Sequence, residues 1–321
     1  MDSKTSFVDR SRRLKFVGLL TIFAGVAFTA LGLAHLALPA AAELVPSLRI
    51  DRAIVATGLL TYVTIGLTLI SCGIGSLRLR RWTRPAMLTV GWVWLLAGLM
   101  IFGYASANIS DLTILVGSGI EELTPELERL LAALVIAPLL IFGCLPPILL
   151  LWIYRDEEIL KTCQAHHPEP DWSDRCTTEV FVLALALGYS GALTLPLALK
   201  PTLPWFGQLW SGPRASLIFV LLGGVLIWSG YALFRLRRSG WWTTGILTTL
   251  LGISSCWTLY LVPRADWYRA LDYPEKMIEE ILRRPSGPPW LAIIVVGAMS
   301  LLTWLYLIRI RHHFTESSKP R

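Results

Sequence analysis

Residues 59–81 read LLTYVTIGLTLISCGIGSLRLRR, and residues 216–238 read SLIFVLLGGVLIWSGYALFRLRR. The two stretches lie 157 residues apart and are identical at ten of 23 positions. Each contains an apolar run long enough for a helix to cross the roughly 30 Å hydrocarbon core of a bilayer. Each ends in the same basic tetrapeptide, RLRR. The pattern predicts a membrane-spanning helix that stops at a bilayer surface, present twice in the chain.

Further runs of similar length predict that the whole chain is a membrane protein. The chain has 321 residues, of which 54% are hydrophobic and only 16% are charged, whereas a soluble domain carries about 25% charged residues. Buried helices of a large soluble protein can also be apolar all round, but this many runs joined by charged loops argue against that alternative. We therefore predict an all-α polytopic bundle of about eight spans. The predicted spans cover residues 16–40, 53–76, 85–108, 129–154, 180–199, 215–236, 241–262 and 290–308.

The matching stretches also predict an internal repeat. Apolar composition can explain matched leucines, but it does not explain two glycines seven residues apart followed by an identical basic tetrapeptide. We expect two four-helix membrane repeats, residues 1–155 and 179–321, joined by a cytoplasmic linker loop at residues 156–178. Four spans per repeat give both repeats the same orientation, so an axis along the membrane normal should relate them.

The matched glycines predict close contact between helices. A glycine has no Cβ atom, so a neighbouring membrane helix can approach its backbone. Residues seven apart lie on nearly the same face of a helix, so each glycine pair should face one neighbour. These helix-packing positions are Gly66, Gly73, Gly223 and Gly230.

The basic residues predict the orientation of the chain. If the N-terminus is cytoplasmic, 19 of the 29 Lys and Arg residues fall on the cytoplasmic side, as the positive-inside rule requires. We therefore expect both termini in the cytoplasm and the protein in a bacterial inner (plasma) membrane. The net charge of +7 then reflects anchoring rather than binding of nucleic acid.

The two RLRR clusters mark helix ends at the cytoplasmic surface. Long arginine side chains can snorkel to the headgroup layer and hold a helix end there. The alternative is a site for anionic lipid heads, which basic clusters beside a span attract. The arginines in question are Arg78, Arg80, Arg81, Arg235, Arg237 and Arg238.

The fourth predicted span contains residues that interrupt a helix. Proline removes a backbone donor and clashes with the preceding turn, so a kink is expected. A kink frees carbonyl groups that could line a substrate path, although proline also occurs in ordinary membrane helices. The residues concerned are Pro138, Gly143, Pro146 and Pro147.

Two longer connections lie on the predicted outer side. In the first, Thr124-Pro125 is a typical helix start, with an N-cap followed by proline at the first helical position. In the second, Ile278, Ile281 and Leu282 form a short apolar face, which predicts a helix lying on the membrane interface. The first connection is also acidic, with Asp111, Glu121, Glu122, Glu126 and Glu128.

The predicted linker contains Cys163, His166, His167 and Cys176. Thiolate and imidazole groups can bind zinc, but this spacing matches no strong zinc pattern. The five cysteines of the chain likewise suggest no disulfide framework. We interpret the linker as a surface loop with two unpaired thiols and expect no metal and no cofactor.

The sequence leaves three functional hypotheses. No acidic or basic residue lies at mid-depth in a predicted span, where proton-coupled machines usually have one. This favours a non-enzymatic structural or accessory subunit, whose partners are the lipid bilayer and other integral membrane proteins. The alternative is a transporter or flippase for an uncharged or lipid-like substrate, with the kinked fourth helix lining the path. A membrane-embedded enzyme that uses the acidic outer loop is the third.

Overall fold

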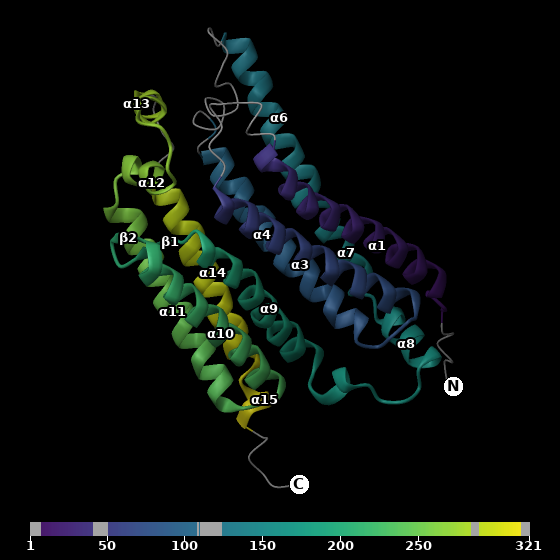
Figure 1. The fold of residues 1–321 in the computed structure, drawn as a ribbon. Helices are drawn as coiled ribbons and strands as arrows, with labels where there is room; N and C mark the ends of the chain where they lie inside the picture. The colour runs from purple at the N-terminus through teal and green to yellow at the C-terminus, as the bar shows by residue number, and fades with distance from the viewer. Residues whose placement is uncertain (1–7, 41–50, 108, 110–123, 284–288, 316–321) are drawn as a thin grey trace.

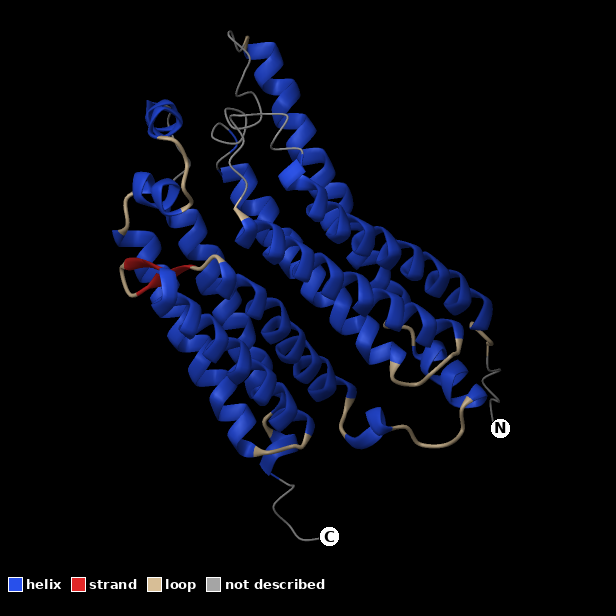
Figure 2. Ribbon diagram, viewed as in Figure 1, coloured by secondary structure: helices blue, strands red, loops and turns tan. Residues whose placement is uncertain are grey.

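The computed structural model describes the chain except for residues 1–7, 41–50, 108, 110–123, 284–288 and 316–321. Long helices make up most of the described chain, and a short β-hairpin lies at one end (Figures 1 and 2). The elements in chain order are α1 (Ser11–Ala34), η1 (His35–Ala37), α3 (Arg52–Leu77), α4 (Thr83–Ala107), α6 (Pro125–Gly143), α7 (Leu145–Tyr154), α8 (Glu157–His166), η2 (Trp172–Arg175), α9 (Thr178–Thr194), η3 (Leu195–Leu199), β1 (Thr202–Trp205), β2 (Gln208–Ser211), α10 (Gly212–Phe234), α11 (Arg238–Leu261), α12 (Arg264–Ala270), α13 (Glu275–Arg283), α14 (Pro289–Ile310) and α15 (His312–Thr315).

Eight helical segments of the described chain are long and apolar enough to cross a bilayer, as predicted. Helices suit hydrocarbon because they satisfy their own backbone hydrogen bonds. The exposure of the side chains also suits a hydrocarbon environment. Along α1, Gly18, Thr21 and Gly25 are buried, whereas Phe16 and Phe23 are 64% and 75% exposed. Small residues therefore face neighbouring helices and large apolar ones face outward, where lipid would cover them.

The spans form two groups of four (Figure 1). α1, α3, α4 and the α6–α7 pair make the first bundle, and α9, α10, α11 and α14 make the second. Both RLRR segments lie at the same end of the molecule, together with the start of α1 and the end of α14. We call this the basic end, and the other the opposite end.

Each bundle has an apolar core near the basic end. In the first, Leu79, Met87 and Tyr154 are buried, and Ile159 of α8 joins them from outside the spans. In the second, the buried core extends to Phe314 of α15. The short helix that follows the last span therefore completes the core in both bundles.

α1 and α3 approach each other closely at glycines. A Cβ atom at Gly25 would lie 2.7 Å from the carbonyl oxygen of Gly66 and 2.7 Å from Cγ1 of Ile70. Real Cβ contacts are longer than this, so only glycine fits at this position. The two backbones can therefore pack more closely than any larger residue would allow.

α9 and α10 make the same contact with matching residue types. A Cβ atom at Gly191 would lie 2.7 Å from the carbonyl oxygen of Gly223 and 2.8 Å from Cγ1 of Ile227. Gly223 and Ile227 follow the corresponding residues of α3 by 157 positions, and Gly191 follows Gly25 by 166. The first helix pair of each bundle thus contains a glycine-on-glycine contact of the same kind.

The RLRR segments end α3 and α10 in the same way. Leu79 and Leu236 have φ angles of 52° and 54°, in the left-handed region that usually favours glycine. The amide that follows each leucine donates to a carbonyl five residues back, from Arg80 to Gly75 at 3.0 Å and from Arg237 to Ala232 at 2.9 Å. A leucine is strained here, and the burial of Leu79 in the core helps to offset that strain.

A second close contact brings together the two helices on either side of this turn. The glycine lies before the turn in the first bundle and after it in the second. In the first bundle, a Cβ atom at Gly75 would collide with Oγ1 of Thr83. In the second, a Cβ atom at Gly240 would lie 2.9 Å from Cβ of Ala232. Gly75 and Ala232 are 157 positions apart, as are Thr83 and Gly240. In the second bundle the backbone also excludes a side chain, because a Cβ atom at Gly240 would lie 2.7 Å from the Leu233 amide nitrogen.

The fourth span is divided into α6 and α7, with the break at Cys144. Pro138 stays inside α6, and the break precedes Pro146 and Pro147 at the start of α7. Gly143, the last residue of α6, presents its carbonyl oxygen to Gly98 of α4, where a Cβ atom would collide with it. The interruption therefore brings the fourth span against the third.

The predicted linker loop differs from the structure. The fourth span ends at Tyr154, and a separate helix, α8, begins at Glu157 with Asp156 as its N-cap. Cys163 is 2% exposed rather than on a surface loop, and burial raises the pKa of its thiol to about 11. The cysteine belongs to the apolar face by which α8 joins the core.

Two further sequence predictions concern the opposite end of the molecule. Thr124 caps α6, with its hydroxyl oxygen accepting from the amide of Leu127 at 3.3 Å, which confirms the predicted helix start. α13 forms as predicted, but Ile278 and Ile281 are buried against Tyr268 of α12. The apolar face of this helix therefore packs largely on protein instead of lying free on the interface.

The β-hairpin was not predicted. β1 and β2 pair antiparallel, and Phe206 and Gly207 form the turn with φ angles of 43° and 84°. The turn docks on α11, because the Phe206 amide donates to Ser254 Oγ and the Gly207 amide donates to Thr258 Oγ1, both at 3.0 Å. These two hydroxyls give both amides of the turn a hydrogen-bond partner.

We predict that alanine at Gly230 destabilises the protein, whereas alanine at Gly224 on the same helix does not. A Cβ atom at Gly230 would collide with the Ala184 carbonyl oxygen, but one at Gly224 meets nothing within 4 Å. Overpacking typically costs about 1–3 kcal/mol. The apparent unfolding temperature in detergent should fall for Gly230→Ala alone. Equal behaviour of the two variants would contradict the close packing of α9 on α10.

Candidate functional site

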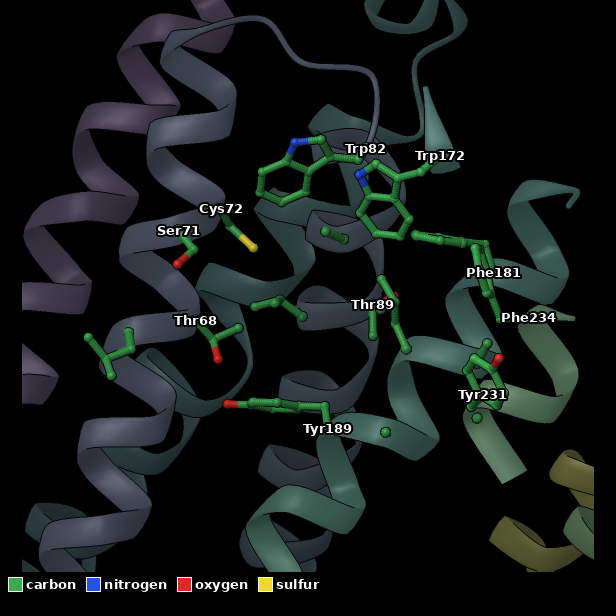
Figure 3. Close-up of a pocket in the computed structure, with 17 residues that line it drawn as sticks. Thr68, Ser71, Cys72, Trp82, Thr89, Trp172, Phe181, Tyr189, Tyr231 and Phe234 are labelled. Carbon is green, nitrogen blue, oxygen red and sulfur yellow. The ribbon is translucent and has the colours of Figure 1, made fainter. Parts of the chain in front are cut away.

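A cavity of about 610 Å³ lies between the two bundles. α3 and α4 supply one wall and α9 and α10 supply the other, and Trp172 of η2 reaches in from the basic end (Figure 3). Its size is within the usual range of small-molecule sites, about 300–1,000 Å³. The cavity therefore exists only because the two bundles lie side by side.

The cavity extends from the basic end to about the middle of the spans. Thr68 lies nine residues before the end of α3, and Tyr189 lies eleven residues after the start of α9. At 1.5 Å per helical residue these residues are about 14–17 Å from the basic end, which is about half of a 30 Å hydrocarbon core.

Hydroxyl groups lie at the inner limit of the cavity. The Tyr189 hydroxyl points across the cavity toward Thr68 (Figure 3). Thr68 donates its own proton to the Thr64 carbonyl oxygen at 2.8 Å, so its oxygen is left to accept a hydrogen bond. Ser71 adds another hydroxyl on the same wall. These groups can exchange hydrogen bonds with a neutral polar group.

Aromatic rings close the cavity toward the basic end. Trp172 lies 5.4 Å from Phe181 and 6.0 Å from Phe234, measured between ring centroids. Phe181 and Phe234 are themselves 5.8 Å apart, and Trp82 lies beside Trp172 (Figure 3). Edge and tilted contacts of this kind stabilise aromatic clusters. The cluster separates the cavity from the basic end of the molecule.

Arg81 holds the segment that carries Trp172. Its Nε donates to the carbonyl oxygen of His167 at 2.8 Å, and its Nη2 donates to that of Pro168 at 3.0 Å. Its Nη1 pairs with Asp174 at 2.8 Å, and the arginine side chain is only 13% exposed. A guanidinium that makes three hydrogen bonds to one short segment fixes that segment firmly.

The chemistry of the cavity is neutral. Its lining residues include no Asp, Glu, Lys, Arg or His. Within the described residues, no group of three or more His, Cys, Asp and Glu side chains could hold a metal ion. In the linker, His166 Nδ1 lies 3.0 Å from the Thr162 carbonyl oxygen, and His167 Nε2 lies 2.9 Å from that of Arg78. The linker imidazoles are thus engaged with backbone.

The site residues predicted from the sequence lie in several separate parts of the structure. All four matched glycines pack helices, and Gly230 also lines the cavity. The residues of the interrupted fourth span do not line this cavity. Arg238 Nε donates to the Phe314 carbonyl oxygen at 3.0 Å, and the Arg235 guanidinium lies 5.9 Å from the Tyr231 ring centroid. Arg78, Arg80 and Arg237 are exposed at the basic end, where lipid-head contact stays a prediction.

Most of the acidic outer connection lies outside the described residues, which omit 110–123.

The cavity residues that sequence reasoning missed are Tyr189, Trp172 and Trp82. A tyrosine in the middle of a span was the one available signal, because its hydroxyl needs a partner in hydrocarbon. Trp172 gave no signal in the sequence, since its position in the cavity depends on how the linker folds.

We predict that Arg81→Ala loosens the segment around Trp172, whereas Arg80→Ala at the neighbouring exposed position does not. Hydrogen bonds to a charged group contribute about 1.5–3 kcal/mol. Their loss should speed amide hydrogen exchange in residues 167–175 by roughly ten- to a hundredfold. Mass-spectrometric hydrogen exchange measures this directly. Unchanged exchange in Arg81→Ala would show that the aromatic cluster alone holds the segment.

Comparison with family models, curated proteins and solved structures found no match to this chain. The fold and the cavity therefore define its class by themselves. Eight candidate spans, large apolar side chains on the outside and small residues between helices make it a polytopic α-helical integral membrane protein.

Proposed function

We propose that this membrane protein binds an uncharged, lipid-like molecule in the cavity between its two bundles. The observation that carries the proposal is a cavity of about 610 Å³ with apolar and aromatic walls, no charged lining residue, and a hydroxyl pair at Tyr189 and Thr68. Such walls suit an acyl or isoprenoid chain. The hydroxyls suit one neutral polar group, because a charge at this depth would have no partner.

The contacts between the bundles close the cavity toward both ends of the molecule. At the opposite end, the Thr57 hydroxyl donates to the Pro196 carbonyl oxygen at 3.2 Å. Lys200 also lies between two carboxylates there, 3.9 Å from Asp51 and 3.1 Å from Asp272. Toward the basic end the rings of Trp172, Phe181 and Phe234 close the cavity, and the Thr89 hydroxyl of α4 donates to the Val182 carbonyl oxygen of α9 at 3.3 Å. A cavity closed toward both ends is what the occluded state of an alternating-access transporter requires, so a transporter or flippase is the role we favour.

Side openings support entry of the ligand from the bilayer. Leu67 and Tyr231 line the cavity, yet they are 55% and 52% exposed. A residue that both lines a cavity and faces outward marks its edge. In this proposal a lipid enters between α3 and α10 without crossing water.

The proposal also covers the orientation of the protein in the membrane and the origin of its two bundles. The positive-inside rule supports a cytoplasmic basic end, with both termini inside and exposed arginines close to anionic lipid heads. The equivalent glycine contacts and the two left-handed leucines support duplication of a four-helix unit. Cysteine accessibility in sealed vesicles tests the orientation.

A structural or accessory subunit is the second candidate. The observation that favours it is a groove between α11 and α14, also of about 610 Å³, with Gly297 open at its surface. This groove lies away from the cavity and could receive a helix of another membrane protein. A partner that co-purifies in fixed ratio, together with an unlabelled cavity, would favour this candidate.

We predict that a photoactivatable diacylglycerol labels the cavity, and that Gly188→Phe blocks this labelling. Gly188 lines the cavity, and a Cβ atom there meets nothing within 4 Å, so a ring would occupy the cavity without a clash at the backbone. Labelled peptides from residues 67–72 and 181–189 should fall by roughly tenfold in this variant, which corresponds to about 1.4 kcal/mol.

Gly224→Phe is the matched control. Gly224 also has open space around it, but it does not line the cavity. Its labelling pattern should match that of the original chain. Labelling spread evenly over all spans, or undiminished by Gly188→Phe, would overturn the proposed binding site.

A further inference from the structure

The linker segment at residues 167–175 is bound to both bundles at the basic end. Its backbone is held by the first bundle, because the three hydrogen bonds from Arg81 reach it from the turn between α3 and α4. His167 Nε2 also lies 2.9 Å from the carbonyl oxygen of Arg78 in the same turn. α8, which leads into the segment, has Cys163 in the core of the first bundle. The backbone of the segment therefore belongs with the first bundle.

The side chain of Trp172 contacts the second bundle instead. Its ring packs on Phe181 of α9 and on Phe234 of α10. Trp82, the neighbour of Arg81, lies beside it on the side of the first bundle (Figure 3). The Trp172 ring thus spans the basic end of the cavity, between walls that belong to different bundles.

The segment is built so that Trp172 can leave this position. Trp172 is 46% exposed, whereas Phe181 is 1% exposed, so the indole has fewer contacts to lose than its partner. Cys176 and Thr177 are the two residues between η2 and α9, and both have an extended backbone. Hinges are a few connecting residues that absorb a change in backbone angles. Movement at these two residues leaves α9 intact.

We propose that residues 167–175 form the gate of the cavity at the basic end. Trp172 blocks the way into the cavity, and Arg81 is the latch that keeps the segment in place. The inference rests on the proposed function, since it assigns the control of access to the same cavity. Hydrogen bonds to a charged group are stronger than contacts between rings, so release from Arg81 is the step that limits opening.

The gate separates two different surroundings. Inside it lies the neutral cavity with the Tyr189 hydroxyl, and outside it lies the basic end with exposed arginines such as Arg78 and Arg80. A lipid chain can lie in the side opening marked by Leu67 and Tyr231. Opening of the gate then gives the polar end of that lipid a path to the headgroup layer at the basic end.

Cys72 reports on the state of the gate. It lines the cavity with its sulfur directed inward and is only 4% exposed (Figure 3). The full chain in mild detergent would be treated with a small, charged methanethiosulfonate reagent, which reaches Cys72 through water and not through the detergent layer. Peptide mass spectrometry gives the rate of modification. We expect Trp172→Ala and Arg81→Ala each to raise this rate roughly tenfold, since each removes a contact that holds the gate closed.

Matched controls exist for both variants. Trp152 is 68% exposed and does not line the cavity, and Arg80 is the exposed neighbour of the latch. Trp152→Ala and Arg80→Ala should leave the rate at Cys72 unchanged. An unchanged rate in Trp172→Ala would overturn the gate, and an unchanged rate in Arg81→Ala would overturn the latch.

Cys163 shows whether a variant still folds. It is 2% exposed in the core beside the linker, so it should stay unmodified in every folded variant. If it reacts in an alanine variant, milder changes decide instead. Asp174→Asn weakens the latch and should still raise the rate at Cys72, and Trp172→Phe keeps a smaller ring and should raise it less than tenfold. No change in either variant would contradict the proposal.

Diacylglycerol separates the gate from the proposed function. A bound lipid should shield Cys72 in Trp172→Ala and return its rate toward that of the original chain. If both alanine variants expose Cys72 but diacylglycerol gives no protection, the gate is supported and the proposed ligand is wrong. If photoactivatable diacylglycerol labels the cavity but neither variant changes the rate at Cys72, the ligand is supported and the gate is wrong.

Discussion

The close approach of backbones at glycine is the contact on which the fold depends. Lipid tails are as apolar as the side chains of the spans, so burial of leucine gives the helices little reason to associate. What remains is packing and hydrogen bonding, and both improve as backbones come closer. Gly25 against Gly66 and Gly191 against Gly223 allow this approach in both bundles. Large side chains such as Phe23 are consequently turned outward.

The same constraint explains how polar groups are arranged. Hydroxyl groups inside the spans mostly bond to the carbonyl four residues back, as Thr21 and Thr244 do at 2.8 Å. Where a hydroxyl bonds to another segment, it marks a junction. Ser254 and Thr258 hold the hairpin, and Thr89 joins the bundles. Tyr189 is the exception, because its hydroxyl borders open space.

Sequence reasoning found the parts of the fold that depend on local composition. The spans follow from hydropathy, and the break near Pro146 follows from the loss of a backbone donor. Parts that depend on distant contacts were missed. The hairpin turn places Phe206 in the left-handed region, where no local preference would put it. The cavity depends on how two bundles lie together, and Trp172 enters it only because Arg81 folds the linker back.

The contact after each RLRR turn carries a consequence for how this chain can vary. In the first bundle the side chain of Thr83 fills the space beside Gly75, and in the second the methyl group of Ala232 and the backbone of Leu233 fill the space beside Gly240. Enlarging either glycine overfills this space, and shrinking Thr83 or Ala232 leaves a void. A residue of one bundle therefore cannot replace its counterpart in the other at a single position: Gly75→Ala would meet Thr83, and Gly240→Thr would meet the backbone of Leu233.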